Sequence, residues 1–261
     1  MQKYIDTHSH VSDEAYGNDA EIEQVIARAL EAGVFKMIVP DIDGKERARM
    51  REVCRRHPGV LYPMAGLYPG SVTALWRDEV DAVERSLREG GITAIGEIGL
   101  DYHWSKDFAA LQKDAFAAQL ELAAQYYLPV NIHLRDATED FFSVMQACRH
   151  LGLRGNMHAF SGSYETFRML QSFGDWRIGI GGVVTFKKAS LQDVVREVPL
   201  DRMLLETDAP YLAPTPLRGT RNESANIPLV AAKIAELQGV SIDTVAEVTT
   251  AGAIELFGLQ E

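Results

Sequence analysis

The feature that most constrains the fold is a regular alternation of short apolar segments with longer amphipathic segments. The short segments, rich in β-branched and aliphatic residues, are expected strands: 4–7, 36–39, 61–66, 94–98, 129–133, 155–158, 176–181 and 203–205. The longer segments are expected helices: 20–32, 45–56, 74–88, 108–126, 138–150, 164–172, 191–198, 225–237 and 242–257. Eight strands that alternate with helices predict an α/β protein, a closed TIM-type (β/α)8 barrel.

The length and composition fit one such barrel. The chain has 261 residues, 46% of them hydrophobic, and can bury one large core, so a single domain over residues 1–261 is expected. No apolar run approaches the roughly 20 residues of a bilayer span, and residues 1–6 lack the apolar stretch of a secretory signal. Cys54 and Cys148 show no ligand or disulfide spacing and are expected to pack in the interior. These features predict a cytoplasmic protein with no membrane contact.

Periodicity also predicts which helix faces are buried. In the helix expected at 108–126, the residues that recur at three- and four-residue steps, and so should face the barrel, are Phe108, Leu111, Ala115, Ala118 and Leu122. In the helix expected at 45–56, the arginines predicted to form a solvated outer face are Arg47, Arg49, Arg51, Arg55 and Arg56.

The formal net charge of -11 argues against a tight, non-specific binder of nucleic acid, because such binding depends on many Lys and Arg contacts to phosphates. A phosphate-containing substrate remains compatible with this charge, since bound dications can reverse the sign of a local field. Lys187, Lys188, Arg218 and Arg221 follow the last two strands, where a polyanion could meet them.

Four histidines lie at or just after the ends of predicted strands, which form the active face of a barrel. His8 and His10 follow the first strand, and their spacing of two directs both imidazoles to one side of an extended chain. His133 and His158 follow the fifth and sixth strands. Any one of them alone is more often a structural residue, so the prediction depends on their convergence with carboxylates.

Carboxylates reach the same face: Asp6 beside the first pair, Glu97 after the fourth strand and Asp208 after the eighth. Two cations about 3.5–4 Å apart can share a water and clamp a displaced oxygen, and a carboxylate must bridge them. Glu97, flanked by small and apolar residues, is the best candidate. Imidazole and carboxylate ligands without thiolate favour zinc, manganese or a similar ion over magnesium. The predicted ligands are His8, His10, Glu97, His133, His158 and Asp208.

With these residues in view, the chain resembles the TatD family of metal-dependent deoxyribonucleases, a branch of the amidohydrolase-like barrels. The resemblance spans nearly the whole chain through five ordered motifs: 5–10 (IDTHSH), 96–102 (GEIGLDY), 129–137 (PVNIHLRDA), 158–162 (HAFSG) and 206–212 (ETDAPYL).

The resemblance implies that His8, His10, Glu97 and Asp208 hold one ion, and that Glu97, His133 and His158 hold a second. It implies that Asp208 acts as general base, and that Arg135 and the 218–222 loop lie near the scissile phosphate. Family members use magnesium or manganese on DNA ends, and zinc often fills the site. It therefore implies a cytoplasmic nuclease with two divalent ions (Mg, Mn or Zn) and DNA ends as substrate. We also expect a monomer without an obligatory protein partner.

One departure concerns substrate binding. Many relatives carry a histidine before the proline that follows strand three, where this chain has Tyr68. We expect the change to shift substrate preference or rate while the metal ligands persist, with Tyr68, Arg135, Arg218 and Arg221 at the substrate.

Two other hypotheses compete with a 3′-5′ exonuclease that cleaves phosphodiesters with a metal-activated water. One is a hydrolase of the same barrel that acts on a small ester, amide, lactone or phosphoester. The other is a metal-stabilised scaffold or binding protein without turnover. Assays on single-stranded DNA beside a panel of small esters and amides separate them, because fold alone does not define function.

Overall fold

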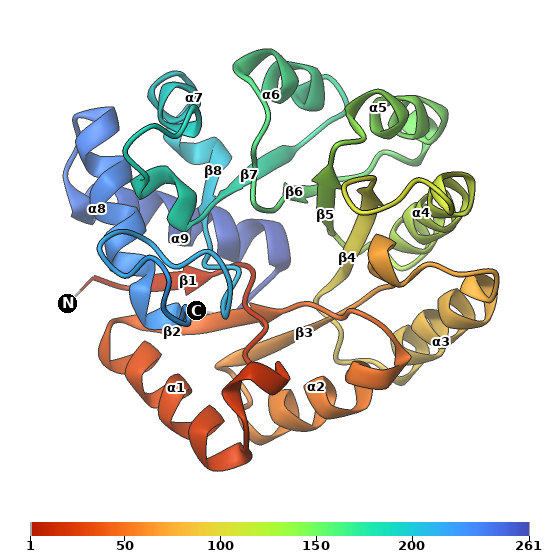
Figure 1. The fold of residues 1–261 in the computed structure, drawn as a ribbon, viewed down its shortest axis with the longest axis horizontal. Coiled ribbons are helices and arrows are strands. Elements are labelled where there is room, and N and C mark those ends of the chain that lie inside the picture. The colour runs from red at the N-terminus through yellow and green to blue at the C-terminus, as the bar shows by residue number, and fades with distance from the viewer. Residues whose placement is uncertain (1, 261) are drawn as a thin grey trace.

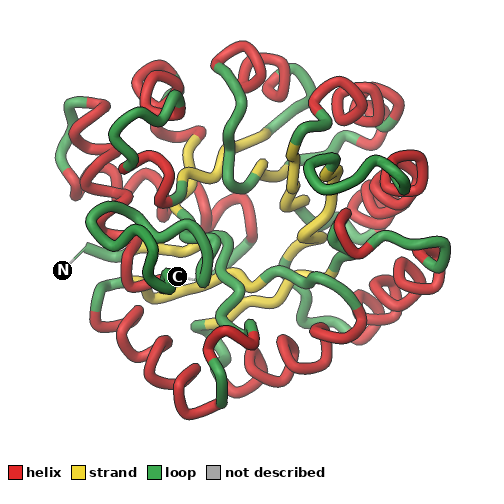
Figure 2. Tube along the Cα trace, in the orientation of Figure 1, coloured by secondary structure: helices red, strands yellow, loops and turns green. Residues whose placement is uncertain are grey.

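The computed structural model describes residues 2–260 and forms a barrel of parallel strands surrounded by helices (Figures 1 and 2). The strands are β1 (Tyr4–Asp6), β2 (Val34–Val39), β3 (Leu61–Ala65), β4 (Ala94–Asp101), β5 (Val130–Arg135), β6 (Gly155–Met157), β7 (Trp176–Ile180) and β8 (Met203–Leu205). The α-helices are α1 (Asp19–Glu31), α2 (Gly44–Arg56), α3 (Trp76–Glu89), α4 (Ala109–Gln125), α5 (Thr138–Ala147), α6 (Tyr164–Gln171), α7 (Leu191–Glu197), α8 (Ile227–Gln238) and α9 (Ile242–Phe257). The predicted barrel is confirmed.

The strands neighbour one another in chain order, from β1 to β8, and each neighbouring pair is parallel. The backbone closes the ring between its first and last strands. The Thr7 amide donates to the Leu205 carbonyl at 2.9 Å, and the Asp208 amide donates to the His8 carbonyl at 2.9 Å. This closure brings residues that follow β1 beside residues that follow β8.

Strands β4 and β5 continue beyond their predicted ends and pair as far as Asp101 and Arg135. Gly99 makes this pairing feasible: its φ is 144°, and a Cβ atom there would collide with the His133 carbonyl oxygen. His133 therefore lies in the paired part of β5, whereas Glu97 lies where the register of β4 with β5 shifts, between Ile95 and Ile98. The Glu97 amide donates to the Asp41 carbonyl at 3.0 Å, so the backbone is held on both sides of the shift.

Two apolar layers hold the barrel. The larger one fills the space between the strands and the surrounding helices. The smaller one lies inside the ring, where Ile5, Ile38 and Leu204 pack against Leu256 and Phe257 of α9. In Figure 1, α9 lies behind the strands. This helix closes the amino end of the barrel, so the carboxyl end is the open one.

The predicted inner face of α4 is partly wrong. Phe108 is exposed and Leu111 and Ala118 are only half-buried, whereas the amide side chains of Gln112 and Gln119 are buried. Gln112 exchanges two hydrogen bonds with the Asp101 backbone, and Gln119 does the same with Leu67. Amides on this face satisfy the backbone at the end of β4 and in the segment that follows β3, a function that apolar periodicity does not reveal.

The arginine-rich face of α2 also differs from the prediction at one position. Arg47 is buried, and its Nε donates to Asp41 Oδ2 at 2.5 Å while Nη2 donates to the Gly66 carbonyl at 3.3 Å. Asp41 is itself buried, which explains why a cation is drawn inward. The two cysteines are buried and free, as expected for packing residues.

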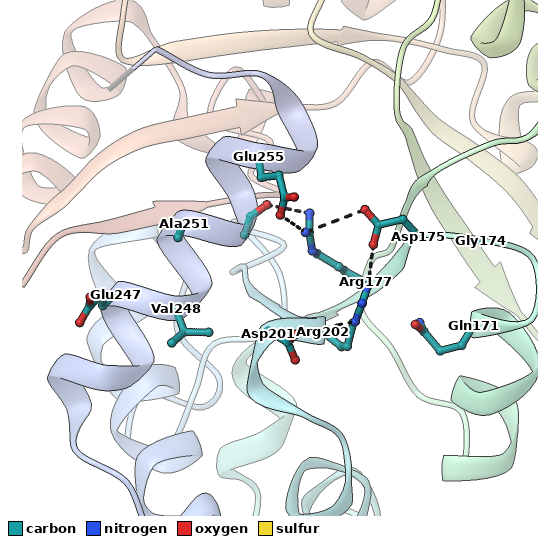
Figure 3. Close-up of a pocket in the computed structure, with 11 residues that line it drawn as sticks. Gln171, Gly174, Asp175, Arg177, Asp201, Arg202, Glu247, Val248, Ala251 and Glu255 are labelled. Atoms are coloured by element: carbon teal, nitrogen blue, oxygen red, sulfur yellow. Dashed lines mark hydrogen bonds and ion pairs between the residues drawn. The ribbon is translucent and has the colours of Figure 1, made fainter.

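At the amino end of the barrel, α9 and the segments that precede β7 and β8 surround a hollow of about 970 Å³ (Figure 3). Arg177 of β7 donates to Glu255 at 2.5 Å and to the Gly252 carbonyl at 2.8 Å. Arg202 donates to Asp175 at 2.5 Å. Both arginines at this hollow are therefore paired with carboxylates.

Within residues 2–260, no helix combines the length and the apolar character that a bilayer crossing requires.

Candidate metal centre

The six predicted ligands meet at the carboxyl end of the barrel. His8 and His10 follow β1, Glu97 lies in β4, His133 lies in β5, and His158 and Asp208 follow β6 and β8. Barrel closure brings these positions together, although they are spread over most of the chain. All six side chains are buried or nearly so, and Glu97 is the more enclosed of the two carboxylates among them, with 4% of its side chain exposed against 16% for Asp208.

Glu97 lies between two groups of imidazoles. Its Oε1 is 2.7 Å from His133 Nδ1 and 2.9 Å from His158 Nε2. Its Oε2 is 3.3 Å from His8 Nε2 and 3.6 Å from His10 Nε2. Each carboxylate oxygen thus faces a different pair of histidines, which is the arrangement that a bridging ligand needs.

Asp208 completes the group on the His8 side. Its Oδ1 lies 3.4 Å from His10 Nε2 and 3.7 Å from His8 Nε2, and these two imidazole nitrogens are 3.1 Å apart. His8 also stacks on His158, with ring centroids 3.8 Å apart. The set therefore forms one continuous cluster in which a third possible ligand group, His8, His158 and Asp208, overlaps the two groups that share Glu97.

The chemistry of this donor set fits divalent cations. Ligand atoms that share one ion at about 2.1 Å lie roughly 3 to 3.5 Å apart, close to the separations observed here. Imidazole nitrogens that face each other across 3.1 Å would repel if both presented lone pairs, and a cation between them removes that conflict. The residues present can therefore hold a divalent cation.

Hydrogen bonds behind the ligands fix the orientation of two imidazoles. His8 Nδ1 is 2.9 Å from Asn131 Oδ1, so this nitrogen donates and Nε2 faces the cluster as an acceptor. His133 Nε2 is 2.9 Å from Asp101 Oδ2, which leaves Nδ1 toward Glu97. Such partners set the tautomer and raise the basicity of a ligating imidazole.

The cluster itself shifts the pKa of its members. Burial lowers the pKa of His8 to about 4, and the charge of His158 acts in the same direction. Burial alone would lower the pKa of His133, but its hydrogen bonds to Asp101 and Glu97 raise it to about 9. Burial also opposes ionisation of Glu97, yet the charges of His158 and His8 hold its pKa well below the usual range. Glu97 is therefore a carboxylate and His8 a neutral imidazole, the forms that bind cations.

Asp6, which the sequence places beside the first histidines, has a structural role. Its carboxylate accepts from the Thr207 amide at 3.0 Å, from Thr207 Oγ1 at 2.5 Å and from the His8 amide at 3.2 Å. Burial raises the pKa of Asp6 to about 6. Asp6 therefore joins the segments after β1 and β8, which carry His8 and Asp208.

Two cavities open beside the cluster. The Trp104 cavity, about 500 Å³, includes His10, Asp13, Tyr68, Trp104 and Tyr211 in its lining. The Phe160 cavity, about 340 Å³, lies on the side of the segments that follow β6 and β7 and includes Phe160, Ser161 and Leu191. The residues that line both cavities are His133, Arg135, His158, Asp208 and Leu212. A substrate at the cluster therefore has room on two sides.

Two of the four predicted substrate residues line these cavities. Arg135 ends β5, is exposed and lines both. The Tyr68 hydroxyl donates to Asp101 Oδ2 at 3.1 Å, and its ring lies edge-on to His133 with centroids 5.0 Å apart. Tyr68 thus contacts the residue that orients His133, in addition to facing the cavity.

The other two predicted substrate residues already have partners. Arg221 donates to Glu21 at 2.6 Å and to Glu223 at 3.2 Å, which favours a structural role. The Arg218 guanidinium lies over the Phe186 ring, 4.1 Å from its centroid. Contact of either arginine with substrate stays a prediction.

Sequence reasoning overlooked Asn131 and Asp101, which orient the ligands. A signal was present for Asn131: it is a polar residue in an apolar strand, two positions before His133 and thus on the same side. Asp101 stands in the same 96–102 motif as Glu97, but its contact with His133 depends on the pairing of β4 with β5.

A (β/α)8 barrel with four histidines and two carboxylates converging at its carboxyl end defines a metal-dependent hydrolase. The family model described as TatD related DNase matches residues 5–258. The chain belongs to this family, in agreement with the resemblance of its five motifs.

Similar proteins agree with this assignment. The uncharacterized metal-dependent hydrolase YabD of Bacillus subtilis (strain 168) is 37% identical over 254 residues, which cover 97% of this chain and 98% of YabD. The 3′-5′ ssDNA/RNA exonuclease TatD of Rahnella sp. (strain Y9602) is 33% identical over 92% of this chain and 94% of that protein. The crystal structure of YjjV, a TatD homologue from Escherichia coli K12, superimposes with a TM-score of 0.89 at 28% identity, with 98% of each chain covered.

Proposed function

We propose that this protein is a 3′-5′ exonuclease that removes nucleotides from single-stranded DNA ends with two divalent cations. The observation that carries the proposal is the position of Glu97, whose two carboxylate oxygens each face a separate pair of imidazoles. One ion would be held by His8, His10, Glu97 and Asp208, and the other by Glu97, His133 and His158. The exonuclease relative at 33% identity supports the choice of substrate.

When bound, two such cations make a water more acidic and polarise the oxygens of a phosphodiester. The protein contributes the remaining steps. Asp208 is the less enclosed of the two carboxylates and borders both cavities, so it is suited to accept the proton of the attacking water. Arg135 lies between the two cavities, where its guanidinium can bind a phosphate oxygen and hold the strand.

All proposed ligands come from one chain, so this site needs no second subunit. We therefore propose a monomeric enzyme, acting in the cytoplasm, with magnesium, manganese or zinc as the ions. Imidazole ligands favour the transition ions, whereas a phosphodiester substrate is compatible with magnesium.

The test starts from protein stripped of metal with a chelator, with ion content measured before and after each dication is restored. The substrate is a single-stranded oligonucleotide labelled at its 5′ end, whose shortening ladder reports the direction of cleavage. Asp208→Asn keeps an oxygen ligand and removes the proton acceptor, so it should lower kcat at least a hundredfold. Asp201→Asn is the matched control, because Asp201 is exposed at the other end of the barrel.

We expect about two ions per chain, dication-dependent shortening from the 3′ end, and wild-type rates for Asp201→Asn. No cleavage of DNA with any dication, together with turnover of small esters or amides, would reject the proposal. Full activity of Asp208→Asn would reject the role given to that residue.

A further inference from the structure

Trp104 is the most exposed of the three tryptophans, and it stands at the edge of the candidate metal centre. Its side chain is 82% exposed, whereas Trp76 and Trp176 are buried. It belongs to the segment that follows β4, the strand that carries Glu97, and it lines the Trp104 cavity together with Glu97, His133 and Asp208. The exposed indole is therefore available to a ligand that enters the cavity.

Neighbouring residues hold the indole in place. The His103 ring lies edge-on to it, with centroids 4.8 Å apart, and His103 is in turn fixed by Asp136 at 2.9 Å. The backbone amide of His103 donates to Asp101 at 2.9 Å, and Asp101 also orients His133. The position of the indole is thus tied to that of a candidate metal ligand.

Arg135 contacts the indole and lines both cavities beside the metal centre. Its guanidinium carbon lies over the Trp104 ring, 5.8 Å from the ring centroid. A nucleotide presents a flat apolar base and an anionic phosphate a few ångströms away. An aromatic face beside a guanidinium matches both parts of that ligand.

A second aromatic ring lies on another wall of the same cavity. Tyr211, from the segment that follows β8, is 54% exposed and donates its hydroxyl to Asp13 at 3.1 Å. The cavity volume of about 500 Å³ lies within the usual range for small-ligand sites. Bases stacked inside a duplex cannot present a face to these rings, whereas an unpaired base can.

We propose that Trp104 is a stacking platform for an unpaired nucleobase, and that it gives the site its preference for single-stranded ends. This inference rests on the proposed nuclease function. The phosphate attached to that base contacts Arg135, and the backbone continues to the metal centre. Stacking depends on the π-face that every base has, so the platform accepts all four bases.

The test combines substitution of the indole with removal of a base. Trp104→Ala and Trp104→Phe are compared with the matched control Phe108→Ala, which removes another exposed aromatic ring from the same segment without changing the cavity lining. Each protein is given a normal oligonucleotide and a series with one abasic residue at successive positions near the 3′ end. Loss of stacking should raise KM about tenfold in Trp104→Ala, with kcat changed by about twofold or less.

In the wild type, one abasic position should raise KM by a similar factor, and Trp104→Ala should lose that discrimination. Trp104→Phe should recover most of the affinity, and Phe108→Ala should match the wild type. An equal abasic effect in wild type and Trp104→Ala would overturn the inference while leaving the nuclease function intact.

Tryptophan fluorescence gives a readout that is independent of turnover. Trp104 is the accessible indole, so a phosphorothioate oligonucleotide, which resists hydrolysis, should quench the emission of the wild type and not that of Trp104→Phe. A single-stranded oligonucleotide should quench more than a blunt duplex of the same length. Absence of quenching overturns the inference, and absence of DNA cleavage with quenching intact overturns the proposed function alone.

Discussion

The two ends of the barrel both carry buried ionisable side chains, but they neutralise them in different ways. At the amino end, Arg177 pairs with Glu255 and Arg202 pairs with Asp175, so both arginines have a carboxylate partner from the chain itself (Figure 3). At the carboxyl end, within residues 2–260, the ion-pair partners of Glu97 and Asp208 are histidines, and their lysine and arginine partners are absent. The difference teaches that the carboxyl end is built for cations that the chain does not supply.

The apolar core supports the same contrast. Helix α9 closes the amino end with Leu256 and Phe257, whereas the carboxyl end is left open to two cavities. A closed end can use ion pairs for stability, because no ligand has to enter. At an open end, the ligand atoms must stay accessible to a metal ion. Among the described residues, the carboxylates of Glu97 and Asp208 are not paired with lysine or arginine, so bound cations must balance their charge.

The largest difference between the two ends should appear when one carboxylate at each end is replaced by its amide. Glu97→Gln removes the carboxylate that we propose bridges two ions and should lower kcat/KM by about a thousandfold or more, with loss of bound metal. Glu255→Gln, with 72% of its side chain exposed, should leave kcat/KM within about twofold. Metal content and nuclease rates of the two purified proteins check this pair, and equal losses in both would erase the contrast.

A smaller effect is expected from substituting a residue that orients a candidate metal ligand through a hydrogen bond. Asp101→Asn weakens the acceptor that holds His133 Nε2, and should lower metal affinity or activity about 10- to 100-fold. Titration of the metal-free protein with Mn²⁺ measures the affinity. The control is Asp140→Asn: Asp140 accepts from Tyr102 on the outside of the same region at 2.8 Å, and this change should leave affinity at the wild-type level.

The amino end should respond in stability alone. Arg177→Met removes the hydrogen bond to the Gly252 carbonyl and the ion pair with Glu255, and should lower the free energy of unfolding by about 1 kcal/mol. The remaining Glu255 is exposed, so water can solvate it. Urea unfolding measures the change, and kcat/KM per folded molecule should equal the wild-type value. A loss of activity without a loss of stability would show that the two ends are coupled.

The smallest expected effect is the number of protons released when a metal ion binds. Without cations, His133 has a pKa of about 9 and is mostly protonated at pH 7.5, but its Nδ1 must be deprotonated to bind an ion. Ion binding at pH 7.5 should therefore release about one proton from His133, and affinity should rise with pH and level off above about 9. Calorimetry in two buffers of different ionisation enthalpy measures the release. Identical apparent enthalpies would contradict the protonation state assigned here.

The sequence predicted the order of strands and helices and the six candidate ligands, because these depend on local periodicity and on residue chemistry. It did not predict the inner face of α4 or the burial of Arg47. In both cases, polar side chains turn inward to satisfy partners that are distant in sequence: the Asp101 and Leu67 backbones for the glutamines and the Asp41 carboxylate for Arg47. The spacing of apolar residues along the sequence does not predict such distant partners.

By itself, the sequence determined that this chain forms a barrel and which side chains gather at its open end, since strand ends of a closed barrel must converge. The tertiary structure alone decided how they are used: Glu97 divides its two oxygens between separate histidine pairs, Asp101 orients His133, and Trp104 lies over the cavity beside Arg135. These contacts depend on the register of β4 with β5 and on the closure of β8 onto β1, which no local stretch of sequence specifies.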